Sequence, residues 1–201
     1  MKKKLLLITL LVFAFNNPLR AQEDIFIFSW DIGFPTSDLS DFLTDEDVSL
    51  GGISMDFRHF VQDNVSIGGY FAWDFFNGAS DGNEMASFPN ADVTGLQRFY
   101  VNYLPIMVNS HYYVGESENI RTYVGAGLGA VRTLQRTSIG TFDIQNDNWH
   151  FGIYPEVGFI VPVSDIGAIT LGAKYHVAFE TDDSITYSYF SLNVGISRGF
   201  F

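Results

Sequence analysis

Apolar and polar residues alternate with a period of two through most of this chain. The alternation is clearest in residues 185–201. Successive side chains of a β-strand point to opposite sides, so this period indicates a strand with one apolar and one polar face. One face of the segment carries Phe190, Leu192, Val194 and Ile196, and the other carries Tyr189, Ser191, Asn193, Gly195 and Ser197.

Eight segments show this alternation, and each is long enough to cross a bilayer at a tilt. We predict an all-β fold: an eight-stranded antiparallel up-and-down transmembrane β-barrel. An even number of strands places both ends of the barrel domain at one rim. The fourth segment is assigned an outward face of Phe99, Val101, Tyr103 and Met107. The segments span about residues 24–34, 48–60, 64–77, 96–114, 120–133, 148–163, 168–180 and 185–201.

The predicted connections are short at one rim and long at the other, as in transmembrane barrels. A secreted β-sandwich or a lipocalin would also alternate, but it would carry fewer charges on the second face of every strand. Pro105 and Pro155 fall inside predicted strands, where each removes a ladder hydrogen bond, so we expect bulges or bends there. The long connections are predicted near 35–47, 78–95 and 134–147.

The first 21 residues differ from the rest of the chain. Three lysines at 2–4 precede an apolar run, Leu5 to Phe15, that is too short to span a bilayer, and Ala21 is a small residue suited to cleavage. This order is typical of a secretory signal peptide, and a buried core helix is the alternative. We therefore expect a signal peptide at 1–21 and a β-barrel domain at 22–201.

Composition limits the kinds of partner and chemistry. Residues 1–21 hold four of the 11 basic side chains, so seven basic and all 23 acidic side chains remain in the rest of the chain. Nucleic-acid phosphates are bound by Lys and Arg, and we exclude nucleic acid as a partner. The chain has no cysteine, which excludes disulfides, cysteine-ligated zinc and thiol catalysis.

Two segments resemble hairpins of small outer-membrane β-barrel domains of the OmpA, OmpX and OmpW type. Residues 104–131 read LPIMVNSHYYVGESENIRTYVGAGLGAV, and residues 151–179 read FGIYPEVGFIVPVSDIGAITLGAKYHVAF. Phe201, an aromatic residue after an amphipathic strand, resembles the assembly signal of such barrels. The resemblance implies the outer membrane of a Gram-negative bacterium, with outer-membrane lipids, lipopolysaccharide and the barrel assembly machinery as partners. Members of this family serve as adhesins, small-molecule channels, structural anchors and lipid enzymes.

The polar faces of the predicted strands carry ten titratable side chains that we place in the lumen. An eight-stranded barrel is just wide enough inside to be filled by side chains. Buried charges must be paired, and a nearly balanced set favours a salt-bridged plug over a narrow polar channel or proton-linked path. The predicted lumen charge network comprises Asp31, Asp56, Arg58, Asp74, Arg98, Arg121, Glu156, Lys174, His176 and Glu180.

The predicted outer loops are strongly acidic, with Arg136 as their one base. Carboxylates could bind Ca²⁺ or Mg²⁺, but no DxDxDG loop is present and we expect no metal site. We also expect no cofactor. The loop acids are Asp38, Asp41, Asp45, Glu46, Asp47, Asp81, Glu84, Asp92, Asp143, Asp147, Asp182 and Asp183.

Histidines and aromatic residues suggest further roles at the rims. We place His59 and His111 near the periplasmic rim and His150 near the outer rim. A lipid A deacylase would need a histidine beside a serine and a carboxylate; no His-x-Ser pair occurs, and we expect no enzyme activity. Aromatic girdles in contact with lipid are predicted for Trp30, Trp73, Trp149, Tyr103 and Tyr175.

Taken together, these patterns predict a monomeric outer-membrane barrel with a plugged, charge-filled lumen and acidic extracellular loops. Its expected role is structural or surface-binding. A channel for small hydrophobic molecules, opening beside Pro105 and Pro155, is the alternative. A lipid-modifying enzyme that uses His150 is the third hypothesis.

Overall fold

The fold was analysed in a computed structural model of the chain. The model describes residues 24–44, 48–88, 91–115, 120–140, 142–164, 166–181 and 184–199, with the backbone alone at 81, 83–88 and 91–93. The predicted signal peptide at 1–21 and the predicted assembly signal at Phe201 lie outside these ranges. Among the described residues, no helix is long and apolar enough to cross a membrane.

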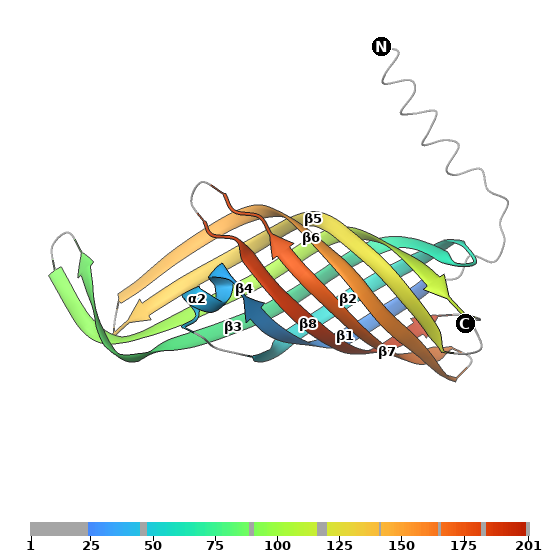
Figure 1. The fold of residues 1–201 in the computed structure, drawn as a ribbon, viewed down its shortest axis with the longest axis horizontal. Helices are drawn as coiled ribbons and strands as arrows, with labels where there is room; N and C mark the ends of the chain where they lie inside the picture. Colours follow the sequence, from blue (N-terminus) through green and yellow to red (C-terminus); the bar gives the residue numbers. More distant parts are fainter. Residues whose placement is uncertain are drawn as a thin grey trace, which may run out of the picture.

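Eight antiparallel strands close into a barrel, each paired with its neighbours in sequence (Figure 1). The first and last strands seal the wall: Trp30 pairs with Val194 and Phe34 pairs with Phe190. The predicted eight-stranded antiparallel up-and-down barrel is therefore confirmed. The strands are β1 (Asp24–Thr36), β2 (Ser49–Gln62), β3 (Val65–Phe88), β4 (Ala91–Val114), β5 (Arg121–Ile139), β6 (Phe142–Ser164), β7 (Gly167–Ala178) and β8 (Tyr187–Gly199), and the helix among the described residues is α2 (Asp38–Phe42).

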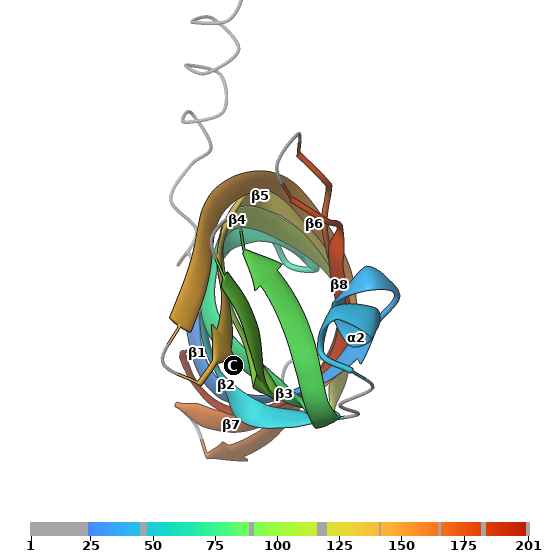
Figure 2. The ribbon, with the colours of Figure 1, turned by 90° about the vertical axis from the view of Figure 1, so that its left-hand side faces the viewer.

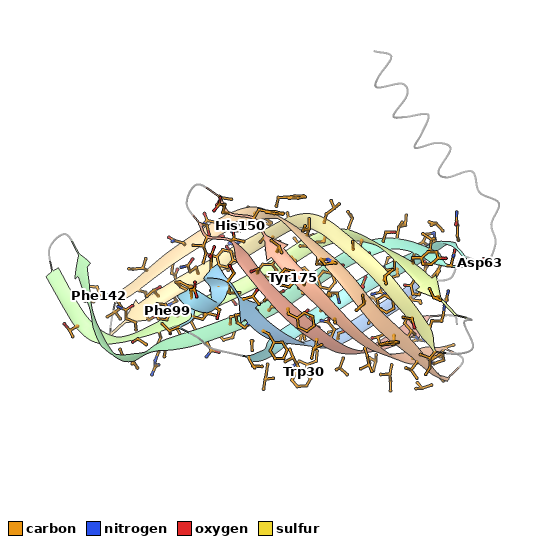
Figure 3. All side chains as sticks on the ribbon, viewed as in Figure 1. Trp30, Asp63, Phe99, Phe142, His150 and Tyr175 are labelled. Atoms are coloured by element: carbon orange, nitrogen blue, oxygen red, sulfur yellow. The ribbon has the colours of Figure 1, made fainter. Side chains whose placement is uncertain are left out.

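The alternation of apolar and polar residues in the sequence corresponds to the outer and inner faces of the barrel wall. In β1, Ile25 and Ile27 are buried inside, whereas Phe26 and Phe28 are exposed outside. Figure 3 shows Trp30 projecting away from the barrel in the same outward row. Large apolar side chains cover the outside of all eight strands, far beyond the apolar patches of ordinary soluble monomers.

The predicted faces of the fourth strand are wrong. Tyr103 points into the lumen and is fully buried, so it cannot belong to an outer aromatic girdle. Aromatic and aliphatic residues occupy both faces of this strand, so hydrophobicity alone does not select the outward row. The inward row that the closed wall imposes is Phe99, Val101, Tyr103, Met107, Asn109, His111 and Tyr113.

The two ends of the barrel differ in height. At the rim near the termini the turns are short, as between Gln62 and Val65. At the other rim, the predicted long connections 78–95 and 134–147 are mostly strand, because β3–β4 and β5–β6 continue as hairpins (Figure 1). We call residues 76–88, 91–101, 132–139 and 142–149 the projecting sheet. The prediction of long loops at 78–95 and 134–147 is therefore wrong: strands β3 to β6 carry the extra length, which makes half of the wall taller.

Pro105 and Pro155 interrupt the ladder without shifting its register. Pro105 pairs with Val131 and Pro155 with Ala126, so both stay in register with β5. On the opposite side, toward β3 and β7, the ladder skips the proline and resumes in the same register. A proline has no backbone N–H, so it cannot donate a hydrogen bond to the one neighbouring strand that this group would face, which explains the local gap in the ladder. The bulges expected at these positions are therefore a wrong prediction.

Candidate functional site in the barrel lumen

Glu156, on β6, is the centre of the charged part of the lumen. Its buried Oε1 accepts hydrogen bonds from Arg58 (3.1 Å) and Tyr123 (2.9 Å) and lies 3.3 Å from Lys174 Nζ. Its Oε2 lies 3.0 Å from His111 Nε2. These partners come from β2, β4, β5 and β7, so one carboxylate links strands on opposite sides of the barrel across the lumen.

Arg58 completes this central cluster. Its guanidinium donates to Asp56 Oδ2 at 2.9 and 2.7 Å and lies 4.3 Å over the ring of Tyr123. Asp56 Oδ1 accepts a further hydrogen bond from Asn109 at 2.8 Å. Every charge in the cluster therefore has a partner of opposite sign, as burial in a low-dielectric interior requires.

The same cluster contains the residue types of a metal site. Ligand atoms of Asp56, His111 and Glu156 lie within 4.8 Å of one another, and all three residues are buried. The Arg58 guanidinium already bridges the two carboxylates, and Lys174 adds a second positive charge. A metal ion would have to displace one cation and approach another, so the geometry favours a salt-bridged cluster over a metal centre.

Two further acids, Asp31 and Asp74, face each other across Gly52. A Cβ on Gly52 would lie 2.3 Å from Asp74 Oδ1 and 2.8 Å from Asp31 Cβ, so both side chains lean over the glycine. Asp74 accepts a hydrogen bond from Tyr189 (2.6 Å) and Asp31 accepts one from Ser54 (3.0 Å). Within the described part of the chain, neither carboxylate is in a salt bridge, in contrast to Asp56 and Glu156.

His176 lies among tyrosines next to these acids. Its ring stacks on Tyr189, with 4.5 Å between centroids and 6° between planes, and Tyr70, Tyr103 and Tyr154 surround it. In the described structure, neither ring nitrogen has a hydrogen-bond partner, and the same holds for the hydroxyls of Tyr70 and Tyr103 and for Asp31 Oδ2. Buried polar groups are nearly always partnered, so this group is exceptional. We call Asp31, Tyr70, Asp74, Tyr103, His176 and Tyr189 the outer chamber.

Apolar layers lie toward both ends of the lumen. Near the termini, a cluster of Ile25, Ile27, Phe60, Tyr113, Tyr123, Ile160 and Ala168 fills the barrel. At the other end, Leu39 and Leu43 beside α2 pack in one cluster with Phe76, Phe99 and Val101. Between them, a cavity of about 10 Å³ is lined by Ser54, Arg58, Glu156 and Lys174, among others, and has room for about one water molecule.

Eight of the ten predicted lumen residues are buried inside the barrel, and two are not. Arg121 lies near the termini, where it donates to the Asp63 carbonyl at 2.7 Å. Arg98 is exposed because the inward row of β4 is the opposite one, and Glu180 is exposed because it follows the end of β7. His111, which we placed at the rim, is instead buried in the central cluster because of the same error in β4.

Sequence reasoning missed the tyrosines as members of the site. Tyr123, Tyr154 and Tyr189 all lie on the predicted polar faces, and each donates to or packs against the charged residues. The parity that places these tyrosines in the inward row was the sequence signal that could have identified them as members of the site. Asn109 had no such signal, because its strand was assigned the wrong face.

His150 occupies a structural position near the outer rim. Its Nε2 lies 2.9 Å from Thr133 Oγ1 and its Nδ1 lies 2.9 Å from the carbonyl oxygen of Phe179. The residue is buried, and no described carboxylate contacts its ring. The arrangement ties β5 and β6 to the end of β7.

Ion pairs cover the outer face of the projecting sheet. Arg132 donates to Asp147 at 2.9 and 2.5 Å, and Arg136 pairs with Asp143. Hydrogen bonds from Ser138 and Arg136 hold the pKa of Asp143 below its usual range. Asp143 therefore stays ionised at neutral pH and its charge is balanced by Arg136. The projecting β5–β6 hairpin thus carries little net charge on this face.

The fold is shared with solved structures, whereas no protein-family model and no curated protein matches the sequence. Ail, the attachment invasion locus protein of Yersinia pestis, is 11% identical, with a TM-score of 0.57 over 90% of this chain and 100% of Ail. Neisserial surface protein A is 11% identical, with a TM-score of 0.56 over 88% and 96%. OprG of Pseudomonas aeruginosa is 12% identical, with a TM-score of 0.53 over 90% and 97%. The chain thus has the fold of small outer-membrane β-barrel proteins.

Proposed function

We propose that this protein is a non-conducting barrel of the outer membrane that binds an extended protein segment at the cell surface. The observation that carries the proposal is the projecting sheet, which continues one side of the wall beyond the barrel and ends in an unpaired strand edge. The closed lumen supports the same role, since it leaves the outer rim as the part available for binding. Outer-membrane lipids, lipopolysaccharide and the barrel assembly machinery are the expected partners of the monomeric barrel itself.

The aromatic residues on the outside support a position in a bilayer. Trp30 and Trp73 both pair with Ile53 and lie at one level of the wall, with their side chains about half exposed. Trp149 and Tyr175 are exposed on the other side of the barrel. Aromatic girdles of this kind lie at the headgroup level on both sides of an apolar band. The projecting sheet then lies outside the bilayer, on the side away from the termini.

The mature chain is expected to give no steady conductance in a planar bilayer. The central cluster and both apolar layers cross the lumen, and an ion would have to enter a space filled by paired charges and aromatic rings. The measurement is single-channel recording after refolding, with heat-modifiable gel migration as proof of folding. The Asp147→Asn variant, altered only on the outer face, is the matched control. A stable open pore in the unmodified protein would contradict the closed lumen.

The projecting sheet has two edges, one on β3 and one on β6, and the proposal concerns the edge of β6. The first pair of β6 with β7 is Gly152 with Ala178, so no described strand pairs with residues 143–149 on that side. The Phe179 amide donates to the Phe151 carbonyl, which shows that odd-numbered residues of β6 direct their backbone groups toward β7. Positions 143, 145 and 147 therefore present N–H and C=O groups to solvent. Such an edge can accept another strand.

Several features that usually protect an edge are missing here. The edge strand has no proline or lysine between 142 and 149, and its two acids are balanced by Arg132 and Arg136. Phe142 and Ile144 are about half exposed on the face that continues the lumen side of the wall. A partner strand could gain both backbone hydrogen bonds and apolar contacts. The chemistry fits an extended peptide with alternating apolar residues.

Gln145→Pro is expected to abolish binding of such peptides without unfolding the barrel. Gln145 directs its N–H to the free edge, so a proline removes one donor there and leaves the β5 ladder in place. A displayed peptide library selected on the refolded protein supplies the ligands, and Gln145→Thr, which keeps the N–H, is the control. If no alternating peptides are enriched, or if Gln145→Pro binds them unchanged, the edge is not the binding surface.

A further inference from the structure

A short flap covers the outer chamber at the low side of the wall. Residues 37–44 contain α2, which lies at the rim beside β8, opposite part of the projecting sheet (Figure 2). Leu39 and Leu43 are fully buried and belong to the same packed cluster as Tyr103 and Tyr189 of the outer chamber. Removal of the flap would therefore take two side chains out of this cluster and reduce the cover between the outer rim and the tyrosines.

The flap is held by tertiary contacts rather than by its own backbone preference. Ser37 and Thr44, at its two ends, have φ angles of 53° and 56°, which side chains with a Cβ rarely adopt, least of all β-branched threonine. Thr44 Oγ1 donates to the Ala79 carbonyl at 2.8 Å, and the Leu43 carbonyl lies so close to Gly78 that an added Cβ would be 2.1 Å away. A segment with two strained ends and few anchors is suited to opening.

The chamber under the flap has the chemistry of a cation site. In the described structure, Asp31 and Asp74 have no cation in a salt bridge; Lys174 of β7 pairs with Glu156, donates to Asn193 at 3.1 Å and lies 5.0 Å over the ring of Tyr70, at the lower side of the chamber. Asp31 Oδ2 and the hydroxyls of Tyr70 and Tyr103 are buried without partners in the described structure. Tyrosine ring faces and unbalanced carboxylates attract an organic cation through cation–π and charge interactions.

We propose that the outer chamber binds a small organic cation and that residues 37–44 open to admit it. The cation would occupy the space vacated by Leu39 and Leu43, with its charge toward Asp74 and Asp31 and its alkyl groups against Tyr103 and Tyr189. The site is closed below by the central cluster around Glu156. Cation binding in this chamber goes beyond the proposed strand binding at the β6 edge and does not depend on it.

The absence of cysteine from the chain allows a direct test by thiol labelling. In Leu39→Cys, the introduced thiol is buried when the flap is closed, so its labelling rate reports opening. Tetramethylammonium chloride is expected to accelerate labelling several-fold, whereas sodium chloride at the same ionic strength is not. The acceleration is expected to be lost when Asp74→Asn is added. Val48→Cys, at an exposed position, is the control and should label at one rate throughout.

Two further substitutions test the opening of the flap independently of cation binding. Ser37→Gly, which relieves the positive φ at the first residue of the flap and removes no side-chain cap hydrogen bond, is expected to slow labelling, and Gly78→Ala, which presses on Leu43, is expected to speed it. Leu43→Cys replaces Leu39→Cys if the latter does not show heat-modifiable folding. Equal acceleration by sodium, acceleration that survives Asp74→Asn, or no response to tetramethylammonium would overturn the cation site. Labelling insensitive to Ser37→Gly and Gly78→Ala would overturn the flap.

Discussion

Glu156→Gln is expected to lower the free energy of unfolding by about 3–5 kcal/mol, the usual loss when one partner of a buried ion pair is removed. Glutamine keeps the size of the side chain but removes the charge that balances Arg58 and Lys174. It also replaces one acceptor oxygen with a donor next to Tyr123 and His111. The effect is large because four strands share this single carboxylate.

The measurement is reversible urea unfolding of the refolded barrel in lipid vesicles. Asp147→Asn is the matched control: it also removes one carboxylate from an arginine pair, but both side chains of that pair are more than two-fifths exposed. Exposed pairs contribute little because water screens them, so the control is expected to unfold like the unmodified protein. Equal losses in the two variants would show that the lumen cluster has no special role in stability.

Gly68→Ala is expected to destabilise the barrel by about 1–3 kcal/mol or more, through overpacking against backbone that cannot move aside easily. A Cβ at Gly68 would lie 1.8 Å from the carbonyl oxygen of Phe57 on the neighbouring strand and 2.9 Å from Asn109 Oδ1. To relieve this contact, β2 and β3 would have to separate locally. Separation would strain the ladder beside Asp56 and Arg58.

Gly69→Ala is the control for this substitution, since it lies next in the same strand. The nearest atom to a Cβ at Gly69 is the Met107 carbonyl oxygen, 3.9 Å away, so the added methyl group makes only an ordinary van der Waals contact. Urea unfolding and heat-modifiable migration are expected to show a stability loss for Gly68→Ala alone. A similar loss in both variants would mean that the cost comes from replacing any glycine in β3, and not from the close approach of β2.

The alternation in the sequence predicted most of the wall correctly. In seven of the eight strands, including β1 with Phe28 outside and Asp31 inside, the outward row is the more apolar one. β4 differs because its inward row also carries large apolar residues, such as Val101 and Met107. These residues pack against the flap and the tyrosines of the outer chamber, an environment that no local pattern in β4 reveals. Arg98, Tyr103 and His111 were misplaced for this one reason.

For the candidate site, the sequence likewise predicted which residues face the lumen but not which of them contact one another. Parity alone predicted that four charged side chains face the lumen, because charged residues in a transmembrane strand point away from lipid. They are Asp56, Arg58, Glu156 and Lys174. Which of them form pairs depends on the stagger of the strands around the barrel. Glu156 lies directly opposite Lys174 on the neighbouring strand β7, whereas it reaches Arg58 of β2 across the lumen. Asp31 and Asp74 approach each other only because Gly52 separates them.

The sequence by itself predicted the barrel, since an apolar row and a charged row on every strand fit a wall with lipid outside and a polar interior better than a β-sandwich, which would carry fewer charges on the second face. The tertiary structure decided what that interior contains. Closure fixed the register of eight strands at once, and the register placed Glu156 within reach of Arg58 and buried Leu39 and Leu43 in one cluster with the tyrosines. It also left residues 143–149 of β6 without a paired strand on one side in the described part of the chain. Contacts between residues far apart in sequence cause these features, and a local pattern does not encode them.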